Sequence, residues 1–410
     1  MKTILIIVGN LIAFLILISA ARAQENNGYI YGTVTTYNNS YTGQIRWGKE
    51  EAFWNDFFNA QKMGDEYYES ILEKSSGDSK SANSWEIESW SPMSIWDNRK
   101  YTRHEFSTQF GNIKKLEVRS KSRVRITLKN GEEIVLSGQG YNDVGTKVTV
   151  YDDELGAVKL DWERIEEVEF KEAPSYFEPS GGGPIYGTIE TFKGSYTGYV
   201  QWDHDERLGN DVLDGESRDG DVSIAFKHIK SIESQGNSCY VTLFSGRNFT
   251  LRGTNDVNSQ NSGIIVTVPE IGKVDIPWKV FDRADFVKTK DTRDAYANYD
   301  KPEGLNGTVE TVRGEKFTGR LVYDVDEAWE VETLEANDGD IEYVIPFDKI
   351  QTITPKNAYY SVIEIRGGDK ILLGEKRDVS ADNDGIIIFP SNGGQPVLVK
   401  WREVAEVKFD

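Results

Sequence analysis

The sequence YGTVTT (31–36) returns as YGTIET (186–191) and again as NGTVET (306–311). In each copy Gly-Thr holds the second and third positions and Thr closes the segment. A repeated segment is the first architectural information in a sequence, because it marks a structural unit that the chain uses more than once. The three copies therefore predict three related units.

Other segments repeat downstream of these copies with matched spacing. They are an aromatic-Thr-Gly segment (41–43, 196–198 and 317–319), a Phe-x-x-Ile segment (Phe110, Phe226 and Phe347), an Asp-Val pair (143–144, 256–257 and 378–379) and a closing Trp (Trp162, Trp278 and Trp401). The predicted units are 24–173, 184–288 and 304–410. The connectors are 174–183, which contains three consecutive glycines and is expected to be a flexible joint, and the polar segment 289–303.

The second half of each unit has the pattern of a β-hairpin. Val124, Ile126 and Leu128 alternate with polar residues, and Asn130-Gly131 then leads into a second β-rich run. Alternation interrupted by Asn-Gly is the strongest short-range hairpin signal. We therefore predict an all-β protein of three tandem antiparallel β units. The repeated Trp, Phe and Ile residues are expected to form the core.

The hairpin segments followed by Phe-x-x-Ile-x-x-Ile resemble small SH3-like or Sm-like β-barrel repeats, and are similar in form to repeats of uncharacterised exported bacterial proteins. The resemblance implies that each unit consists of two small SH3-like barrel halves, each of which is marginal in size for a core of its own. It implies no activity, because fold does not determine function.

Residues 1–23 have the three parts of a secretory signal peptide. Lys2 is the positive start, residues 4–18 are largely apolar, and Ala21-Arg22-Ala23 matches a cleavage site. The alternative is an uncleaved anchor, but about 20 apolar residues are needed to span a bilayer. We expect export to the periplasm or the exterior, without stable membrane insertion after cleavage.

Charge and residue usage narrow the function classes. The net charge of -20 argues against nucleic acid as a partner. The single cysteine, Cys239, excludes an intramolecular disulfide framework. None of the common catalytic motifs that we sought occurs in the sequence. A pair of carboxylates for glycoside hydrolysis stays possible, because that chemistry needs only two acids at a suitable distance. Catalysis is left open, and the sequence favours a protein that is not an enzyme.

Unit 1 carries an insertion, predicted at about 57–99. The distance from Trp47 to Phe110 is 63 positions, against 24 in each of the other units. Apolar spacing predicts one or two amphipathic helices over about 50–74. Clustered aromatic residues can form a platform for a ligand or partner, and the candidates are Trp54, Tyr67, Trp85, Trp90 and Trp96. The alternative is a lid that packs on the unit.

Acidic residues cluster in units 2 and 3 directly after the residues that match Trp47. Closely spaced carboxylates are the ligands that Ca²⁺ prefers, and the candidates are Asp203, Asp205, Glu206, Asp211, Asp324, Asp326 and Glu327. The spacing is not that of an EF-hand, because Arg207 and Leu208 interrupt it. The alternative is a solvated acidic loop, and Ca²⁺ is the only cofactor considered.

These observations favour an exported, non-enzymatic binding or scaffold protein of the cell envelope, whose partner is a protein or polysaccharide. One alternative is a carbohydrate-binding or carbohydrate-active protein, in which the clustered Trp residues stack on sugar rings. The other is a structural surface protein whose repeats are themselves the function.

Overall fold

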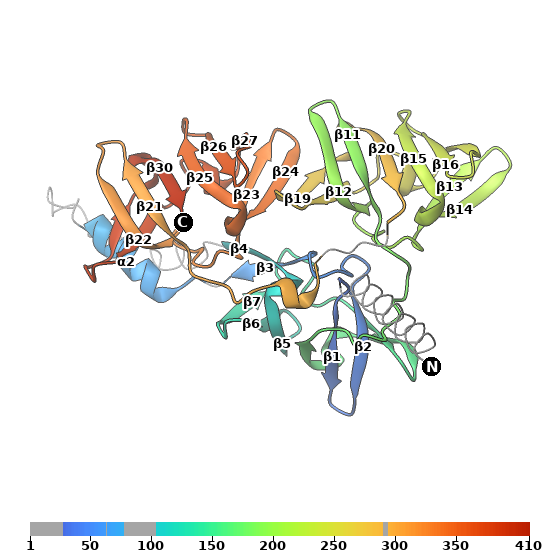
Figure 1. Cartoon of the computed structure of the whole chain (residues 1–410), viewed down its shortest axis with the longest axis horizontal. Coiled ribbons are helices and arrows are strands. Elements are labelled where there is room, and N and C mark those ends of the chain that lie inside the picture. The colour runs from blue at the N-terminus through green and yellow to red at the C-terminus, as the bar shows by residue number, and fades with distance from the viewer. Residues whose placement is uncertain (1–27, 63, 78–103, 290–293) are drawn as a thin grey trace, which may run out of the picture.

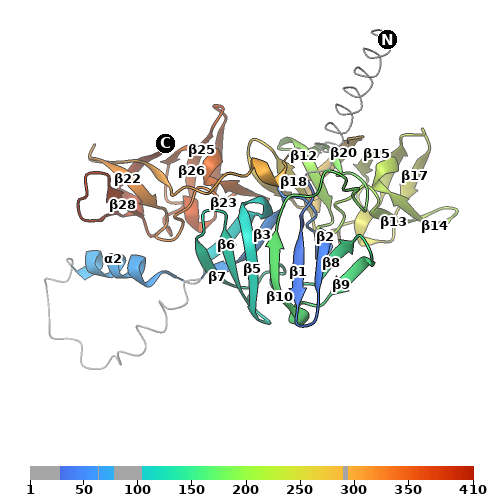
Figure 2. The same cartoon turned by 60° about the horizontal axis from the view of Figure 1, so that its bottom comes forward.

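Unit 1 is built around one antiparallel sheet, whose strands follow the order β9-β8-β2-β1-β10-β5-β6-β7 before the hairpin β3–β4 (Figure 2). The computed structural model describes residues 28–62, 64–77, 104–289 and 294–410. The strands of unit 1 are β1 (Tyr31–Thr36), β2 (Ser40–Trp47), β3 (Phe57–Lys62), β4 (His104–Gln109), β5 (Ile113–Ser120), β6 (Arg123–Leu128), β7 (Glu133–Ser137), β8 (Val148–Asp152), β9 (Gly156–Leu160) and β10 (Ile165–Phe170).

Unit 2 repeats this order in its own strands. They are β11 (Tyr186–Thr191), β12 (Gly194–Trp202), β13 (Val212–Ser217), β14 (Gly220–Ala225), β15 (Ile229–Ser234), β16 (Cys239–Leu243), β17 (Asn248–Leu251), β18 (Ile264–Val268), β19 (Gly272–Ile276) and β20 (Phe281–Val287). The pairings give β19-β18-β12-β11-β20-β15-β16-β17, and β13–β14 forms a separate hairpin.

Unit 3 has the same order once more, β29-β28-β22-β21-β30-β25-β26-β27, with the hairpin β23–β24 paired to β27. Its strands are β21 (Asn306–Thr311), β22 (Lys316–Val322), β23 (Thr333–Asp338), β24 (Ile341–Pro346), β25 (Ile350–Pro355), β26 (Tyr360–Ile365), β27 (Lys370–Gly374), β28 (Ile386–Pro390), β29 (Val397–Val399) and β30 (Val404–Phe409).

The prediction of an all-β protein is confirmed. The three repeated hairpins turn at Gly131, Gly246 and Gly368, which have φ values of 96°, 87° and 100° that favour glycine. The sheets differ from the small barrels that the resemblance implied, because none of them closes on itself in the described ranges. Short 3-10 turns link the strands, at 110–112, 162–164, 226–228, 255–257, 278–280, 296–298, 347–349, 377–379 and 401–403.

The repeated aromatic residues form the core of each unit, as the sequence predicts. Trp47 packs edge-on against Trp162, with ring centroids 6.0 Å apart, and Trp202 packs against Trp278 in the same way at 5.9 Å. In unit 3 Tyr323 replaces the first of these tryptophans and lies 5.8 Å from Trp401. Cys239 is a buried free thiol, as expected.

The insertion of unit 1 lies at the tip of the β3–β4 hairpin. Its sister hairpins β13–β14 and β23–β24 turn within two residues, whereas 63–103 separate β3 from β4. The predicted start at 57 is therefore wrong, because 57–62 form the strand β3. The helix expected over about 50–74 is wrong in extent, because α2 spans Glu66–Gly77 and 50–62 form a loop and a strand.

The three units contact one another (Figure 1). Strand β19 of unit 2 pairs with β24 of unit 3, which joins their sheets, and unit 1 lies against both. Helix α2 packs on unit 3, where Tyr68 and Ile71 contact a cluster around Val325 and Ile387. The connector 174–183 is held against unit 1, and so differs from a flexible joint: Gln44 and Ser180 exchange two hydrogen bonds. No helix in the described ranges is long and apolar enough to cross a membrane.

Candidate functional site

An acidic loop follows each of the equivalent core residues Trp47, Trp202 and Tyr323, at 48–56, 203–211 and 324–332. We call these the acidic loops. Each ends in a carboxylate that folds back on its own loop: Asp56 accepts hydrogen bonds from the backbone N–H groups of Ala52 and Phe53, both at 2.8 Å. Asp211 and Glu332 do the same for the residues three and four positions before them. These carboxylates shape the loops.

The second oxygen of each of these carboxylates binds a cation from another unit. Asp56 of unit 1 accepts from Arg207 of unit 2, at 2.9 Å from Nε and 2.7 Å from Nη2. Asp211 of unit 2 in turn accepts from Arg46 of unit 1 through both of its oxygens, from Nη1 at Oδ1 and from Nη2 at Oδ2, each at 2.8 Å. The acidic loops of units 1 and 2 are thus cross-linked reciprocally.

The acidic loop of unit 3 is joined to unit 1 in a different way. Lys62, at the end of β3, donates to Glu332 at 2.6 Å and lies 3.5 Å from Asp326. Burial opposes the charge of Lys62, but Asp326 and Glu332 outweigh it and raise the lysine pKa. His104 of β4 lies 3.7 Å from Asp326. Burial, with help from Arg377 and Lys62, lowers the pKa of His104 to about 4, so the imidazole is neutral at pH 7.

A pair of carboxyl groups lies beneath each acidic loop, and all six groups are buried except Glu206, which is half-buried. The pairs are Glu51 with Asp143, Glu206 with Asp256, and Glu327 with Asp378, and the Asp of each accepts a hydrogen bond from a strand N–H at 2.6–2.7 Å. Burial, reinforced by Asp256, raises the pKa of Glu206 to about 9, and burial raises that of Asp256 to about 6. Burial also raises the pKa of Glu51 and Glu327. Glu206 therefore holds its proton at neutral pH.

The backbone of two acidic loops is held in an unfavourable conformation. Asp203 and His204 have φ values of 51° and 62°, and Asp324 and Val325 have 46° and 63°. A β-branched residue such as Val325 is seldom found in the left-handed region. In unit 1 the same turn begins with Gly48, which adopts φ 60° without steric cost. The surrounding contacts of units 2 and 3 must compensate for this strain.

Most of the predicted calcium ligands have protein partners. Asp203 accepts from Asn255 and from the N–H of Ser262, Asp205 pairs with Lys49 at 3.0 Å, and Asp324 pairs with Arg377 at 2.5 Å. Glu206 and Glu327 each retain one buried oxygen without a hydrogen-bond partner in the described structure, as does Asp326. The structure does not gather the seven predicted residues around one point, because they belong to two separate units.

Three carboxylates come close together in unit 1. Oxygens of Glu50, Glu51 and Asp143 all lie within 4.8 Å of one another. The sequence analysis did not include these residues as ligands, because Asp143 lies more than 90 positions from the two glutamates. The available signal for Asp143 was its place in the repeated Asp-Val pair.

Two of the five residues predicted for the aromatic platform, Trp54 and Tyr67, lie in the described part of the chain. Trp54 is fully buried and packs edge-on against Phe170 at 5.9 Å, so it is a core residue. Tyr67 lies on α2, is 55% exposed and stacks with Phe389 of unit 3 at 6.2 Å. Trp85, Trp90 and Trp96 lie outside the described residues. Trp54 therefore belongs to the core of unit 1, whereas Tyr67 lies at the contact between units 1 and 3.

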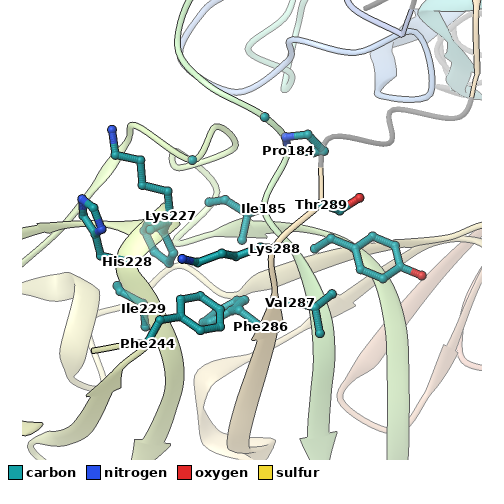
Figure 3. A pocket seen from close by; sticks show the side chains of 14 residues that line it. Pro184, Ile185, Lys227, His228, Ile229, Phe244, Phe286, Val287, Lys288 and Thr289 are labelled. Carbon is teal, nitrogen blue, oxygen red and sulfur yellow. The ribbon is translucent and has the colours of Figure 1, made fainter. Parts of the chain in front are cut away.

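An open pocket of about 510 Å³ lies on unit 2 beside the start of its first strand (Figure 3). Ile185, Ile229, Phe244 and Phe286 gather at its floor, and Lys227 and His228 project at one side. The ammonium group of Lys288 lies 4.6 Å from the centre of the Phe244 ring. The pocket therefore combines an apolar floor with cationic side chains, in a protein whose overall charge is strongly negative.

The same position is filled in unit 1. The backbone N–H of Gly111 donates to the carbonyl of Trp54, just as that of Lys227 donates to Gly209 and that of Asp348 to Glu330, so Trp54, Gly209 and Glu330 are equivalent. Tyr296 of the connector 289–303 packs on Trp54 with centroids 4.5 Å apart. Unit 2 has glycine where unit 1 has the Trp54 indole. This difference opens the pocket.

In unit 3 polar groups span the equivalent position. Arg366 stands where unit 2 has Phe244, and it donates to the carbonyls of Asp348 at 2.8 Å and Asp410 at 2.6 Å. Two further cavities lie between units: one of about 320 Å³ where all three units meet, and a groove of about 810 Å³ between units 1 and 2, which Glu206 and Arg46 line.

In comparisons with known proteins, the chain matches no protein-family model and no curated protein. The sequence patterns did not predict the pocket, because Gly209 belongs to none of the repeated segments. The available signal is the alignment of the three units, which places Trp54, Gly209 and Glu330 at equivalent positions.

Proposed function

We propose that this protein is an exported, non-catalytic binding protein, in which three β units form one scaffold and unit 2 presents the ligand pocket. The observation that carries this proposal is the contrast between units. The position that Trp54 and Tyr296 fill in unit 1 is open in unit 2, over a floor of core residues. An apolar concave surface with a few charged groups is the usual form of a binding site.

The contacts between the units support the scaffold part of the proposal. Arg207 with Asp56 and Arg46 with Asp211 link units 1 and 2, and the β19–β24 pairing links units 2 and 3. The Arg207–Asp56 pair is buried and so favours one relative orientation of units 1 and 2, because another would leave its charges buried without each other. A pocket on such a scaffold keeps its shape without a ligand, which lowers the entropic cost of binding.

Export is the second part of the proposal and rests on residues 1–23. Fractionation of cells that express the full chain tests it, with a chain that lacks 1–23 as the control. We expect the full chain outside the cytoplasm and the shortened chain inside. Equal distribution of the two chains would contradict export.

Binding at the pocket is tested with a set of small aromatic carboxylates and amines, followed by two-dimensional NMR on residues 24–410. We expect shifts at the amides of Lys227, Phe244 and Lys288. In Gly209→Trp, which restores the residue type of unit 1, we expect these shifts to vanish. Absence of any fragment binding at these residues, or equal shifts in the variant, would refute the proposal.

A further inference from the structure

We infer that the pocket of unit 2 binds an aromatic side chain flanked by carboxylates, presented by an acidic segment of a partner protein. The inference rests on the proposed function and names the ligand class for the same pocket. It comes from the way in which unit 1 fills the equivalent position.

The occupant in unit 1 is a segment of this chain, Asp294 to Asp300, with the sequence DAYANYD. The Tyr296 hydroxyl donates to the carbonyl of Ile113 at 3.0 Å, and the Lys129 ammonium lies 3.5 Å from the centre of the Tyr296 ring. Lys129 also donates to the carbonyl of Tyr299 at 2.9 Å. The fold of these units thus already accepts an acidic, tyrosine-containing segment at this position.

Unit 2 keeps one of the contacts that hold Tyr296 in unit 1 and replaces another, while Gly209 in place of Trp54 leaves room for a ring. Ile229 is equivalent to Ile113, so a backbone carbonyl is available at the same place in the floor. Phe244 takes the place of Lys129 and offers an aromatic face in place of the ammonium. Aromatic pairs with offset or edge geometry add about 0.5–1.5 kcal/mol beyond their area, so an inserted ring keeps a specific partner.

Two cations at the rim of the pocket, Lys227 and Lys288, indicate which residues would flank that ring. Lys227, His228 and Lys288 are exposed at its rim, where unit 1 has Gly111, Asn112 and Glu172. A carboxylate next to the inserted aromatic residue would meet Lys227 and Lys288, in a protein whose net charge of -20 otherwise disfavours acidic partners. In unit 1 the Tyr299 ring packs on Gly111 so closely that a Cβ there would clash with it, and unit 2 has Lys227 at this position, so we expect room for one aromatic residue and not two.

The probe is a capped peptide of the sequence DAYANYD, titrated calorimetrically into residues 24–410 at low and at high salt. We expect weak binding that loses at least ~10-fold in affinity when both tyrosines of the peptide are alanine. We expect a similar loss in Gly209→Trp, because the indole fills the pocket. Phe244→Ser is a second variant, with a milder effect on folding because Phe244 is 37% exposed.

The role of charge is tested by Lys227→Glu with Lys288→Glu, against Lys114→Glu with Lys159→Glu. All four lysines are exposed, and the control pair lies on strands of unit 1. We expect the first double variant to lose ~10-fold in affinity at low salt, the second to keep it, and the difference to shrink at high salt.

Three outcomes would overturn the inference. They are unchanged peptide affinity in Gly209→Trp and Phe244→Ser, equal effects of the two charge-reversed pairs, and a peptide that fails to bind while small aromatic fragments or an oligosaccharide do bind in the pocket. In the last case the proposed function survives with a different ligand class, so the two failures can be told apart.

Discussion

Arg207 of unit 2 and Asp56 of unit 1 form an ion pair of 2.7 Å in which the side chains are only 1% and 4% exposed. The guanidinium also lies 4.9 Å from the centre of the Phe53 ring and donates to the carbonyl of Val200. One arginine thus joins the acidic loops of two units. In the sequence, Arg207 interrupts the spacing of an EF-hand calcium loop. In the structure, it pairs with Asp56 and links units 1 and 2.

Removal of Arg207 should strongly destabilise the contact between units 1 and 2. In Arg207→Met we expect a loss of about 3–5 kcal/mol in the free energy of unfolding, because Asp56 becomes a buried charge without a partner. Adding Asp56→Asn should recover part of the loss. The measurement is urea unfolding, with Lys121→Ala as the control, since its pair with Glu163 is exposed. An equal loss of unfolding free energy in Arg207→Met and Lys121→Ala would contradict the expectation.

The buried carboxyl pairs should make the protein more stable in mild acid. Glu206 has a pKa of about 9 in the folded chain against an ordinary 4.5. The folded state therefore binds this proton more tightly than the unfolded state does, so the free energy of unfolding falls as pH rises from about 4.5 to about 9. Partial exposure of Glu206 to solvent reduces the effect.

The glutamate can be tested by Glu206→Gln, which cannot ionise. We expect the variant to lose less stability than the wild type between pH 5 and pH 8, by about 1–2 kcal/mol after allowance for solvent. The measurement is urea unfolding at both pH values. The control is Glu163→Gln on the surface, which should leave the pH dependence unchanged. A parallel pH dependence in Glu206→Gln and wild type would show that Glu206 ionises normally.

Calcium remains a hypothesis, which a thermal melt can test. A ligand that binds the folded state raises the melting temperature. Because Asp203, Asp211 and Asp324 already accept hydrogen bonds or ion pairs from the protein, we expect no rise between chelator and millimolar Ca²⁺. A rise that is lost in Asp203→Asn or Asp324→Asn would reinstate the predicted site. A rise that is lost in Asp143→Asn would indicate the cluster of unit 1.

Replacement of 63–103 by Gly-Asp should leave unit 1 folded. Gly339-Asp340 joins β23 to β24 in this way, and Gly suits the positive φ of such a turn. The variant loses the packing of Tyr68 and Ile71 on unit 3, so we expect a loss of about 1–2 kcal/mol in stability. Circular dichroism and urea unfolding provide the measurement. Unfolding of the whole chain would mean that the insertion is essential to the fold.

Loss of the Tyr296 ring should release the connector 289–303 from unit 1. In Tyr296→Ala we expect faster hydrogen exchange at 295–300 and a loss of about 1–3 kcal/mol, because the ring leaves both Trp54 and the Lys129 ammonium. Tyr359→Ala is the matched control, since Tyr359 is 69% exposed. Unchanged exchange in Tyr296→Ala would also weaken the parallel drawn between the two pockets.

Local sequence patterns determined the units and their hairpins. Val124, Ile126 and Leu128 alternate before Asn130-Gly131, and such a pattern is sufficient because strand periodicity and turn geometry depend on neighbouring residues. The core role of Trp47, Trp162 and their repeats followed from the same reasoning. The insertion was found by comparing spacings, but its start was misplaced, because the apolar residues of a strand and a helix are hard to distinguish over six positions.

Tertiary structure alone decided what the differences between the units do. Trp54 was predicted as a ligand platform and is a core residue, because its indole covers Phe170 beneath a connector that follows unit 2. Asp56, Asp211 and Glu332 shape loops that meet cations from other units, and no local pattern predicts which units will touch. Gly209 became informative only when the pocket was seen beside its filled counterpart. The sequence by itself determined the repeated sheet, since local periodicity encodes it, whereas the pocket and the carboxyl pairs depend on contacts between residues far apart in the chain.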